Sequence, residues 1–153
     1  MEWRNIILRI SVVVTTYNGK MHLEKQLLSL LQQERAPDEV LIFDDGSTDG
    51  TIELVQSFIR KNCLESWQFY VNAKRKGWKQ NFMEGLRKAA GDILFPCDQD
   101  DIWYPKKLAE MTAVMEQHPE IKLLACDYRV IYESGALKAT VYKKTPAETQ
   151  GLI

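Results

Sequence analysis

Apolar and polar residues follow one another along the chain in blocks that predict strands and helices in alternation. Residues 6–14 are mostly β-branched and almost continuously apolar, which is typical of a strand buried on both faces. Leucines then recur at positions 23, 27, 30 and 31, a spacing that places them on one face of a helix. Further strands are predicted at residues 40–43, 67–71 and 92–95, and further helices at residues 52–59, 82–90 and 105–115.

This alternation predicts βαβ units, and therefore an α/β fold with a mostly parallel sheet. Ser47 or Asp49 is expected to cap the helix that follows the second strand. Beyond the last of these helices, a strand is predicted at residues 122–126, with one or two more around residues 134–135, as far as Val141.

Polar clusters follow three of the predicted strands, at residues 15–19, 44–49 and 98–101. In open parallel sheets, ligands bind beyond the carboxyl ends of the strands. We therefore expect these three segments, which are far apart in the sequence, to lie along one edge of the sheet and to form a site there.

Composition narrows the class of protein. The chain has 153 residues, of which 45% are hydrophobic, and this suits a single globular domain over residues 1–153. Lys and Arg number 20 against 21 Asp and Glu, so the net charge of -1 argues against a nucleic-acid-binding protein. No apolar stretch approaches the roughly 20 residues of a membrane span, and no signal peptide is evident, so we expect a cytoplasmic location.

The three cysteines, Cys63, Cys97 and Cys126, have neither a disulfide nor a zinc-binding spacing, and we expect core or near-core thiols in a reducing compartment. The sequence also lacks a glycine-rich dinucleotide motif, a P-loop and a Gly-x-Ser-x-Gly elbow. These absences argue against dinucleotide oxidoreductases, P-loop enzymes and α/β hydrolases.

The acidic turn at residues 98–101 contains three carboxylates in four residues, directly after a predicted strand. Such a set of hard oxygen ligands suits Mg²⁺ or Mn²⁺, which commonly bridge to substrate phosphates. An ordinary solvated turn, with one Asp capping the helix near Pro105, explains the same residues equally well.

Three other features allow two interpretations each. The basic residues 74–76 and Lys79 suit a diphosphate or a solvated surface loop. Tyr17 is placed either to stack on a nucleotide base or to pack on the neighbouring helix. Asp45 either accepts a hydrogen bond from a pyrimidine N3–H or caps its own Asp-Gly turn.

Three motifs together resemble family 2 glycosyltransferases. Residues 12–19 read Val-Val-Val-Thr-Thr-Tyr-Asn-Gly, residues 41–49 read Leu-Ile-Phe-Asp-Asp-Gly-Ser-Thr-Asp, and residues 98–105 read Asp-Gln-Asp-Asp-Ile-Trp-Tyr-Pro. The resemblance runs over residues 10–135 and implies the GT-A fold, a Rossmann-like, mostly parallel sheet with helices on both faces. The third motif is similar to that of members that build bacterial surface polysaccharides, including rhamnosyltransferase-like ones.

The resemblance also implies roles for individual residues. Thr15 and Tyr17 match residues that line the base, and Asp45, with Asp44 beside it, matches the carboxylate that reads the pyrimidine N3–H. Asp100 would hold the divalent ion on the diphosphate. The implied nucleotide-binding residues are Thr15, Tyr17, Asp44, Asp45, Arg75, Lys79 and Asp98, and the implied ligands of Mn²⁺ or Mg²⁺ are Asp98 and Asp100.

The implied activity is an inverting, metal-dependent transfer of a sugar from a UDP- or dTDP-sugar to a saccharide or lipid-linked acceptor. A non-catalytic module that binds a nucleotide or nucleotide-sugar is the alternative. Because family members continue into an acceptor-binding part that supplies the general base, we expect this chain to be the donor-binding portion alone. Asp127 is a candidate for the base, but an ordinary acid at a strand end is the alternative. We further expect self-association through exposed apolar surface, and peripheral docking of a full-length parent at the inner membrane face.

Overall fold

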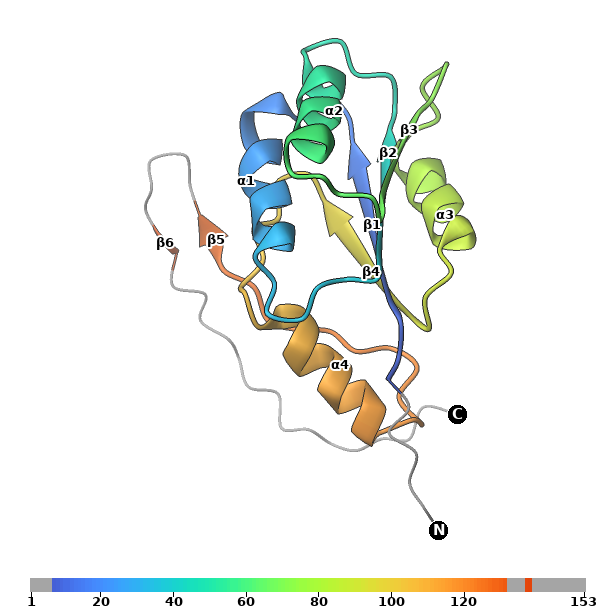
Figure 1. Ribbon diagram of the computed structural model, residues 1–153, viewed down its shortest axis with the longest axis vertical. Coiled ribbons are helices and arrows are strands. Elements are labelled where there is room, and N and C mark those ends of the chain that lie inside the picture. Colours follow the sequence, from blue (N-terminus) through green and yellow to red (C-terminus); the bar gives the residue numbers. More distant parts are fainter. Residues whose placement is uncertain (1–6, 132–136, 139–153) are drawn as a thin grey trace. The chain divides into compact units, whose positions relative to one another are not determined.

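The computed structural model describes residues 7–131 and 137–138, and the chain divides into two units, residues 1–122 and 123–153. The first unit contains a four-stranded parallel sheet in the order β3-β2-β1-β4 (Figure 1). Its elements are β1 (Ile10–Thr16), α1 (Lys20–Leu31), β2 (Glu39–Asp44), α2 (Thr51–Lys61), β3 (Trp67–Val71), α3 (Trp78–Lys88), β4 (Ile93–Asp98) and α4 (Lys107–Gln117). The second unit contains β5 (Val130–Ile131) and β6 (Leu137–Lys138), which pair antiparallel.

Strand β1 is the central element of the sheet, with β2 on one side and β4 on the other. Every residue of β1 is buried, as its continuous apolar pattern predicts. The last parallel pairs place Thr16 opposite Asp44 of β2, and Thr15 opposite Asp98 of β4. The ends of three strands are thereby fixed side by side at one edge of the sheet.

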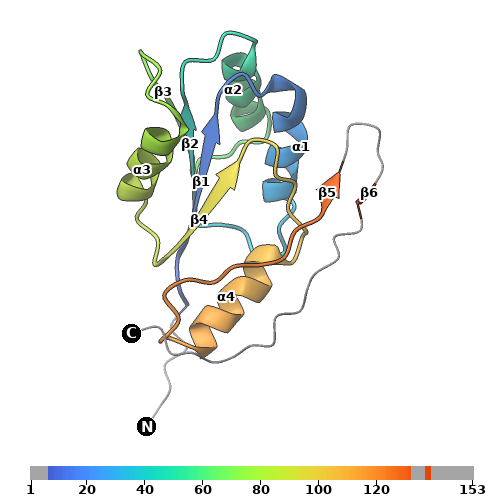
Figure 2. The same cartoon turned by 180° about the vertical axis from the view of Figure 1, so that it is seen from behind.

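Helices cover both faces of the sheet, which confirms the predicted α/β class. Alternate residues of β1 point to opposite faces, so Val12 and Val14 pack with the leucines of α1, and Val13 packs toward α3. The views in Figures 1 and 2 show α3 on the opposite face from α1 and α2. The larger core contains Leu23, Leu27, Leu30, Val55, Phe58 and Leu108, and Phe82, Leu86 and Ala89 line the smaller core beneath α3.

The sequence predicts that the fourth strand ends at Phe95, whereas β4 continues to Asp98. Pro96 lies within this strand opposite Val13. Among the described residues β4 is paired on one side only, and an edge strand tolerates proline because its missing N–H is not needed by a second neighbour. The extension carries Asp98 to the end of the sheet.

Two expectations about the chain's ends differ from the structure. Residues 7–9 are not in a strand, and β1 begins at Ile10. The strand predicted at residues 122–126 is wrong: these residues belong to no helix or strand, and Leu123 is 90% exposed. Of the one or two strands expected around residues 134–135, β5 and β6 lie on either side of that position, whereas residues 134–135 and 139–141 lie outside the described residues.

Two local expectations are also corrected. The N-cap position of α2 is occupied by Gly50, whose φ of 92° is left-handed, and by neither Ser47 nor Asp49. The carboxylate of Asp49 nevertheless accepts a hydrogen bond from the N–H of Thr51, the first residue of the helix, at 3.0 Å. Of the three free cysteines only Cys97 is buried, whereas Cys63 and Cys126 are exposed. Among the described residues no helix is both long enough and apolar enough to cross a membrane.

Gly85 allows α3 to lie close against the sheet. A Cβ atom at this position would lie 2.4 Å from Cγ1 of Val13 and 3.1 Å from the ring of Phe43. The ring of Phe43 is itself stacked on Tyr70, with 4.8 Å between the ring centroids, so it has little room to move.

We predict that Gly85→Ala lowers the free energy of unfolding by about 1–3 kcal/mol through overpacking. The usual effect of Gly→Ala within a helix is a stabilisation of about 1 kcal/mol, so the sign of the change in the free energy of unfolding tests the packing. Urea denaturation measures the effect, and Gln80→Ala, at an exposed position of the same helix, is the control. A Gly85→Ala protein as stable as the wild type would contradict the close approach.

Candidate functional site at the carboxyl edge of the sheet

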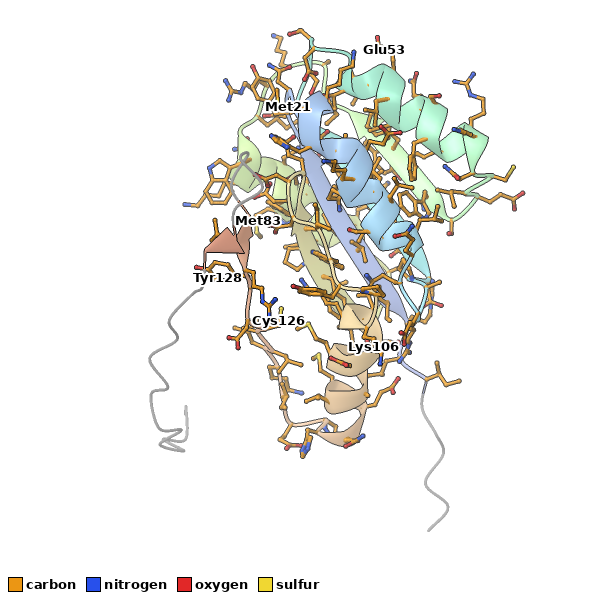
Figure 3. All side chains as sticks on the ribbon, turned by 90° about the vertical axis from the view of Figure 1, so that its left-hand side faces the viewer. Met21, Glu53, Met83, Lys106, Cys126 and Tyr128 are labelled. Carbon is orange, nitrogen blue, oxygen red and sulfur yellow. The ribbon has the colours of Figure 1, made fainter. Side chains whose placement is uncertain are left out.

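The order of the strands reverses between β1 and β4, since β2 and β3 lie on one side of β1 and β4 lies on the other. In open parallel sheets, ligands bind beyond the carboxyl ends of the strands, at the point where the strand order reverses. The turn after β1 begins at Tyr17, and the acidic turn after β4 follows Asp98. The labelled Met21 and Glu53 show that α1 and α2 also begin at this edge (Figure 3).

Tyr17 is half-buried, and the guanidinium of Arg75 lies 4.0 Å from the centre of its ring. This is the geometry of a cation–π contact, which holds the flat guanidinium against the face of the ring. Asn18, whose φ of 47° is left-handed, fastens the same turn to the loop after β2. Its N–H donates to Oγ of Ser47 at 2.8 Å, and its Oδ1 accepts from the N–H of Thr48 at 2.9 Å.

Asp44 is fully buried and serves the protein's own loops. Its Oδ2 accepts hydrogen bonds from the hydroxyls of Thr16 and Ser47, both at 2.6 Å. Its Oδ1 accepts from the N–H groups of Gly46 at 3.0 Å and Ser47 at 2.7 Å. With both oxygens occupied in this way, Asp44 holds the end of β1 to the loop after β2.

Asp45 is also buried, but it anchors a different segment, the basic loop at residues 72–77. Its Oδ1 accepts from the N–H of Lys76 at 2.7 Å and from Nδ2 of Asn72 at 3.0 Å, and its Oδ2 accepts from the N–H of Gly77 at 2.8 Å. Burial alone raises the pKa of Asp45, but these hydrogen bonds and the charge of Arg75 outweigh it and hold the pKa below its ordinary value. The carboxylate is therefore ionised in the folded protein near neutral pH.

In the acidic turn a carboxyl pKa is raised, in contrast to the lowered pKa of Asp45. Partial burial raises the pKa of Asp98, and the nearby carboxylates of Asp100 and Asp101 raise it further. Among the described residues no Lys, Arg or His forms an ion pair with any of these three acids. The turn therefore gathers negative charge that no cation of the described protein neutralises.

This donor set fits a hard divalent cation. Carboxylate oxygens are the ligands that Mg²⁺ and Mn²⁺ prefer, and two of them leave coordination positions for water and phosphate. In the described part of the chain no group of three or more His, Cys, Asp or Glu side chains is arranged to hold a metal by itself.

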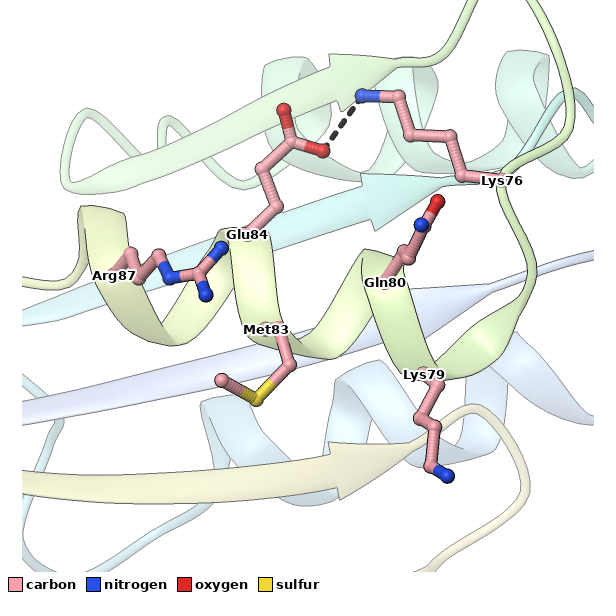
Figure 4. A pocket seen from close by; sticks show the side chains of 6 residues that line it. All are labelled: Lys76, Lys79, Gln80, Met83, Glu84 and Arg87. Atoms are coloured by element: carbon pink, nitrogen blue, oxygen red, sulfur yellow. Dashed lines mark hydrogen bonds and ion pairs between the residues drawn. The ribbon is translucent and has the colours of Figure 1, made fainter.

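The remaining predicted residues are placed in two different surroundings. Thr15 is buried within β1, opposite Asp98. Lys79 lies on the outer side of α3, where it lines a groove with Met83 and Arg87 (Figure 4). The same groove includes Lys76, whose Nζ forms an ion pair with Glu84 at 2.6 Å. Of the basic residues, Arg75 is the one that contacts Tyr17.

Side-chain amides complete the edge, and sequence patterns did not point to them. Gln99, in the middle of the acidic turn, forms hydrogen bonds with both backbone groups of Tyr17. Asn72 donates to Oδ1 of Asn81 at 2.8 Å as well as to Asp45, and Asn81 donates to the carbonyl of Phe43 at 2.8 Å. Uncharged amides produce no pattern of charge or periodicity, which is why sequence reasoning missed them.

Helix α1 and the residues just after it support the segment that follows the acidic turn. The hydroxyl of Ser29 accepts from the N–H of Trp103 at 3.0 Å. The amide of Gln33 donates to the carbonyl of Tyr104 at 2.9 Å and accepts from the N–H of Leu108 at 3.1 Å. These buried polar residues therefore fix the path of the chain from the acidic turn into α4.

Comparison with known proteins agrees with this arrangement. The chain matches the model of the Glycosyl transferase family 2 over residues 11–141. The protein named putative glycosyltransferase EpsE from Bacillus subtilis is 25% identical over 138 residues, which are 90% of this chain and 49% of that protein. The poly(ribitol-phosphate) beta-N-acetylglucosaminyltransferase TarS from Staphylococcus aureus is 30% identical over 120 residues, which are 77% of this chain and 21% of that protein.

Solved structures share the fold. The crystal structure of Staphylococcus aureus TarS 1–349 has a TM-score of 0.65 and 28% identity, over 72% of this chain and 33% of that one. The mannosyltransferase PcManGT from Pyrobaculum calidifontis, in complex with GDP-Man and Mn²⁺, has a TM-score of 0.66 and 28% identity, over 71% of this chain and 32% of that one. The chain thus spans less than half the length of the curated relatives it matches.

The lowered pKa of Asp45 predicts part of the protein's acid sensitivity. A carboxylate with a lowered folded-state pKa stabilises the fold above its ordinary value of 3.8, and this contribution is lost as the pH falls through the folded-state pKa. We predict that Asp45→Asn is less stable than the wild type near neutral pH and that the difference narrows below about pH 4. Urea denaturation across a pH series measures it, and a difference independent of pH would contradict the ionised anchor.

Proposed function

Because the chain belongs to glycosyl transferase family 2, as its resemblance to that family predicted, we propose that it is the nucleotide-sugar-binding part of a glycosyltransferase. The reaction moves a sugar from a nucleoside diphosphate donor to a saccharide or lipid-linked acceptor in the synthesis of a cell-surface polysaccharide. The names of EpsE and TarS support the reaction class. Structures of TarS with UDP and with UDP-GlcNAc support a nucleotide-sugar as donor.

One observation carries the proposal: three features lie together at the edge where the strand order reverses. They are the cation–π pair of Tyr17 and Arg75, the buried Asp45, and the acidic turn, whose charges no described cation neutralises. An aromatic face suits a base, and a guanidinium suits either the base or a phosphate. Carboxylates with no protein cation suit a divalent ion bound to a diphosphate. Together they match the successive parts of a nucleoside diphosphate.

Asp45 reads the base in this proposal, and its hydrogen bonds restrict how it does so. Oδ1 already accepts two hydrogen bonds, whereas Oδ2 accepts one, from the N–H of Gly77. A carboxylate oxygen accepts two, so Oδ2 retains one position for a ring N–H. Uracil and thymine offer such a donor at N3. The carboxylate thus anchors the basic loop and receives the base at once.

Asp98 and Asp100 hold Mn²⁺ or Mg²⁺ in this proposal, with Asp98 nearer to the ribose and sugar. The bound ion supplies Lewis acidity toward the departing diphosphate. The structure of PcManGT with GDP-Man and Mn²⁺ supports the use of such an ion by a protein of this fold. Arg75 adds positive charge on the same edge, and Lys79 reaches the phosphates only if its side chain leaves the groove on α3.

The chemistry is an inverting displacement at the anomeric carbon. An acceptor hydroxyl attacks that carbon while the bond to the diphosphate breaks, and a general base takes the hydroxyl proton. Asp127 is the candidate base in this chain, and the structure describes it as an exposed residue of the second unit, outside any strand. We propose that residues of a longer parent complete the acceptor site, and that such a parent acts at the inner membrane face. Exposed apolar residues such as Ile102 and Tyr104 favour contact with a partner or a second copy.

A non-catalytic module that binds a nucleotide or nucleotide-sugar is the second candidate, because the chain covers only part of its relatives. Both candidates bind the donor, and only the enzyme transfers or hydrolyses it. The deciding experiment is calorimetric titration with UDP, dTDP, GDP and ADP, with and without Mn²⁺, followed by a donor-hydrolysis assay. Failure of every nucleotide to bind would exclude both candidates.

We predict that Asp100→Asn weakens the binding of UDP in the presence of Mn²⁺ by about tenfold or more, because it removes a ligand of the ion. Binding of UDP without metal should change little. Asp101→Asn is the matched control, since it removes the same charge from the same turn outside the Asp98-x-Asp100 pair. Equal losses in both variants would point to a general charge effect and contradict the assigned ligand.

We further predict that Asp45→Ala weakens UDP and dTDP more than ADP. The lost hydrogen bond to a charged acceptor is worth about 1.5–3 kcal/mol, which is roughly tenfold to a hundredfold in affinity. Adenine has no ring N–H on the corresponding edge and gains nothing from the carboxylate. Because Asp45→Ala also releases the loop at residues 72–77, the ratio between nucleotides is the measurement, and equal losses for all bases would remove the base-reading role.

A further inference from the structure

Gln99 lies between Asp98 and Asp100 in the acidic turn, yet its side chain binds the backbone of Tyr17 in the turn after β1. Its Oε1 accepts a hydrogen bond from the N–H of Tyr17 at 2.9 Å, and its Nε2 donates to the carbonyl of Tyr17 at 3.2 Å. Both backbone groups of Tyr17 are therefore paired with one amide side chain. Gln99 itself is half-buried in this position.

This pairing continues the β1–β4 ladder after the backbone has left it. The last parallel pair of the two strands is Thr15 with Asp98, and from Gln99 the chain turns away from the sheet. A neighbouring strand would satisfy one donor and one acceptor of β1, and the amide of Gln99 offers the same two groups. The amide of Gln99 thus takes the place of a neighbouring strand beyond the end of β4.

Gly19 provides the space for this amide. A Cβ atom at position 19 would lie 2.1 Å from Oε1 and 2.5 Å from Cδ of Gln99, so a larger residue here would displace the amide of Gln99. The φ of Gly19 is -104°, a value that any residue adopts, so the glycine is not needed for its backbone conformation. Its lack of a side chain serves the contact with Gln99.

The turn that Gln99 holds is already fixed on its other side. The N–H of Gly19 donates to Oγ1 of Thr51 at 3.0 Å, and the N–H of Asn18 donates to Oγ of Ser47 at 2.8 Å. These contacts tie residues 17–19 to the loop after β2 and the start of α2. Among the described contacts, the amide of Gln99 is what ties the same residues to the acidic turn.

From these contacts we infer that Gln99 is a positioning residue, which sets the distance between the base-stacking ring of Tyr17 and the carboxylates of Asp98 and Asp100. The inference rests on the proposed function, because it assigns those two turns to the two ends of one nucleoside diphosphate. A ligand that joins both ends gains affinity from their fixed spacing, whereas a fragment that occupies one end does not.

The test compares three ligands in the whole chain: UMP without metal, pyrophosphate with Mn²⁺, and UDP with Mn²⁺. In Gln99→Met, which keeps the length of the side chain but none of its hydrogen bonds, we expect UDP with Mn²⁺ to bind about tenfold more weakly. The two fragments should change by less than about twofold, because each still finds its own turn. Gln32→Met, at an exposed position near the end of α1, is the control and should leave all three affinities unchanged.

A double-mutant cycle separates this role from loss of folding. Gly19→Ala should displace the amide and weaken UDP with Mn²⁺ about as much as Gln99→Ala does, whereas the double variant should be no weaker than either single variant. Hydrogen exchange gives a readout without any ligand: the N–H of Tyr17 should exchange faster in both single variants, while N–H groups of β2 stay protected.

The outcomes distinguish the inference from the proposed function. If the wild type binds UDP and Gln99→Met binds it equally well, or weakens the fragments as much as the whole nucleotide, the positioning role is overturned and the proposed function stands. Additive effects of Gly19→Ala and Gln99→Ala would overturn it too. If the wild type binds no nucleoside diphosphate while Tyr17 exchange still depends on Gln99, the contact is real but the proposed function fails, and the positioning role fails with it.

Discussion

Burial of β1 on both faces is the constraint on which the rest of this structure depends. A strand with no exposed face needs a layer of helices on each side and a neighbour along each edge, and the chain supplies them with α1 and α2, α3, β2 and β4. Its backbone can therefore expose polar residues only where it ends. The turn at residues 17–19 lies at that end, beside the ends of β2 and β4. The functional edge is a direct consequence of the buried centre.

The acids at this edge look alike in the sequence but differ in their surroundings. Both oxygens of Asp44 accept hydrogen bonds from hydroxyl and N–H groups of the protein. Asp45 uses most of its hydrogen-bond acceptor positions to bind the loop at residues 72–77. Partial burial raises the pKa of Asp98, and the charges of Asp100 and Asp101 raise it further. Hydrogen-bond donors thus stabilise the ionised form of Asp45, whereas no described Lys, Arg or His forms an ion pair with the carboxylates of the acidic turn. Two anchors of different loops and a turn of unpaired carboxylates thus arise from the same residue type.

Loops at this edge are joined mainly by side chains that contact backbone. Asp45 binds the N–H groups of Lys76 and Gly77, Ser47 binds that of Asn18, and Gln99 binds both groups of Tyr17. Such contacts fix the path of a loop more firmly than contacts between mobile side-chain ends, because each one removes freedom from the main chain itself. The arrangement gives short loops a defined spacing without further secondary structure, which a ligand that touches several of them requires.

The sequence by itself determined the class of fold, because apolar periodicity reports burial directly: the runs before residues 15, 44 and 98 mark strands, and the leucines of α1 mark a helix. It also determined that Tyr17, Asp45 and the acidic turn share an edge, since parallel strands end together. Sequence patterns predicted strand boundaries wrongly where pairing with a neighbouring strand sets them. Examples are the extension of β4 through Pro96 and the predicted strand at residues 122–126, which does not form. Only the tertiary structure decided which acid is an anchor, that Arg75 and not Lys79 meets Tyr17, and that Gln99 fits against Gly19. These are contacts between single side chains remote in the sequence, and neither charge nor periodicity along a chain encodes them.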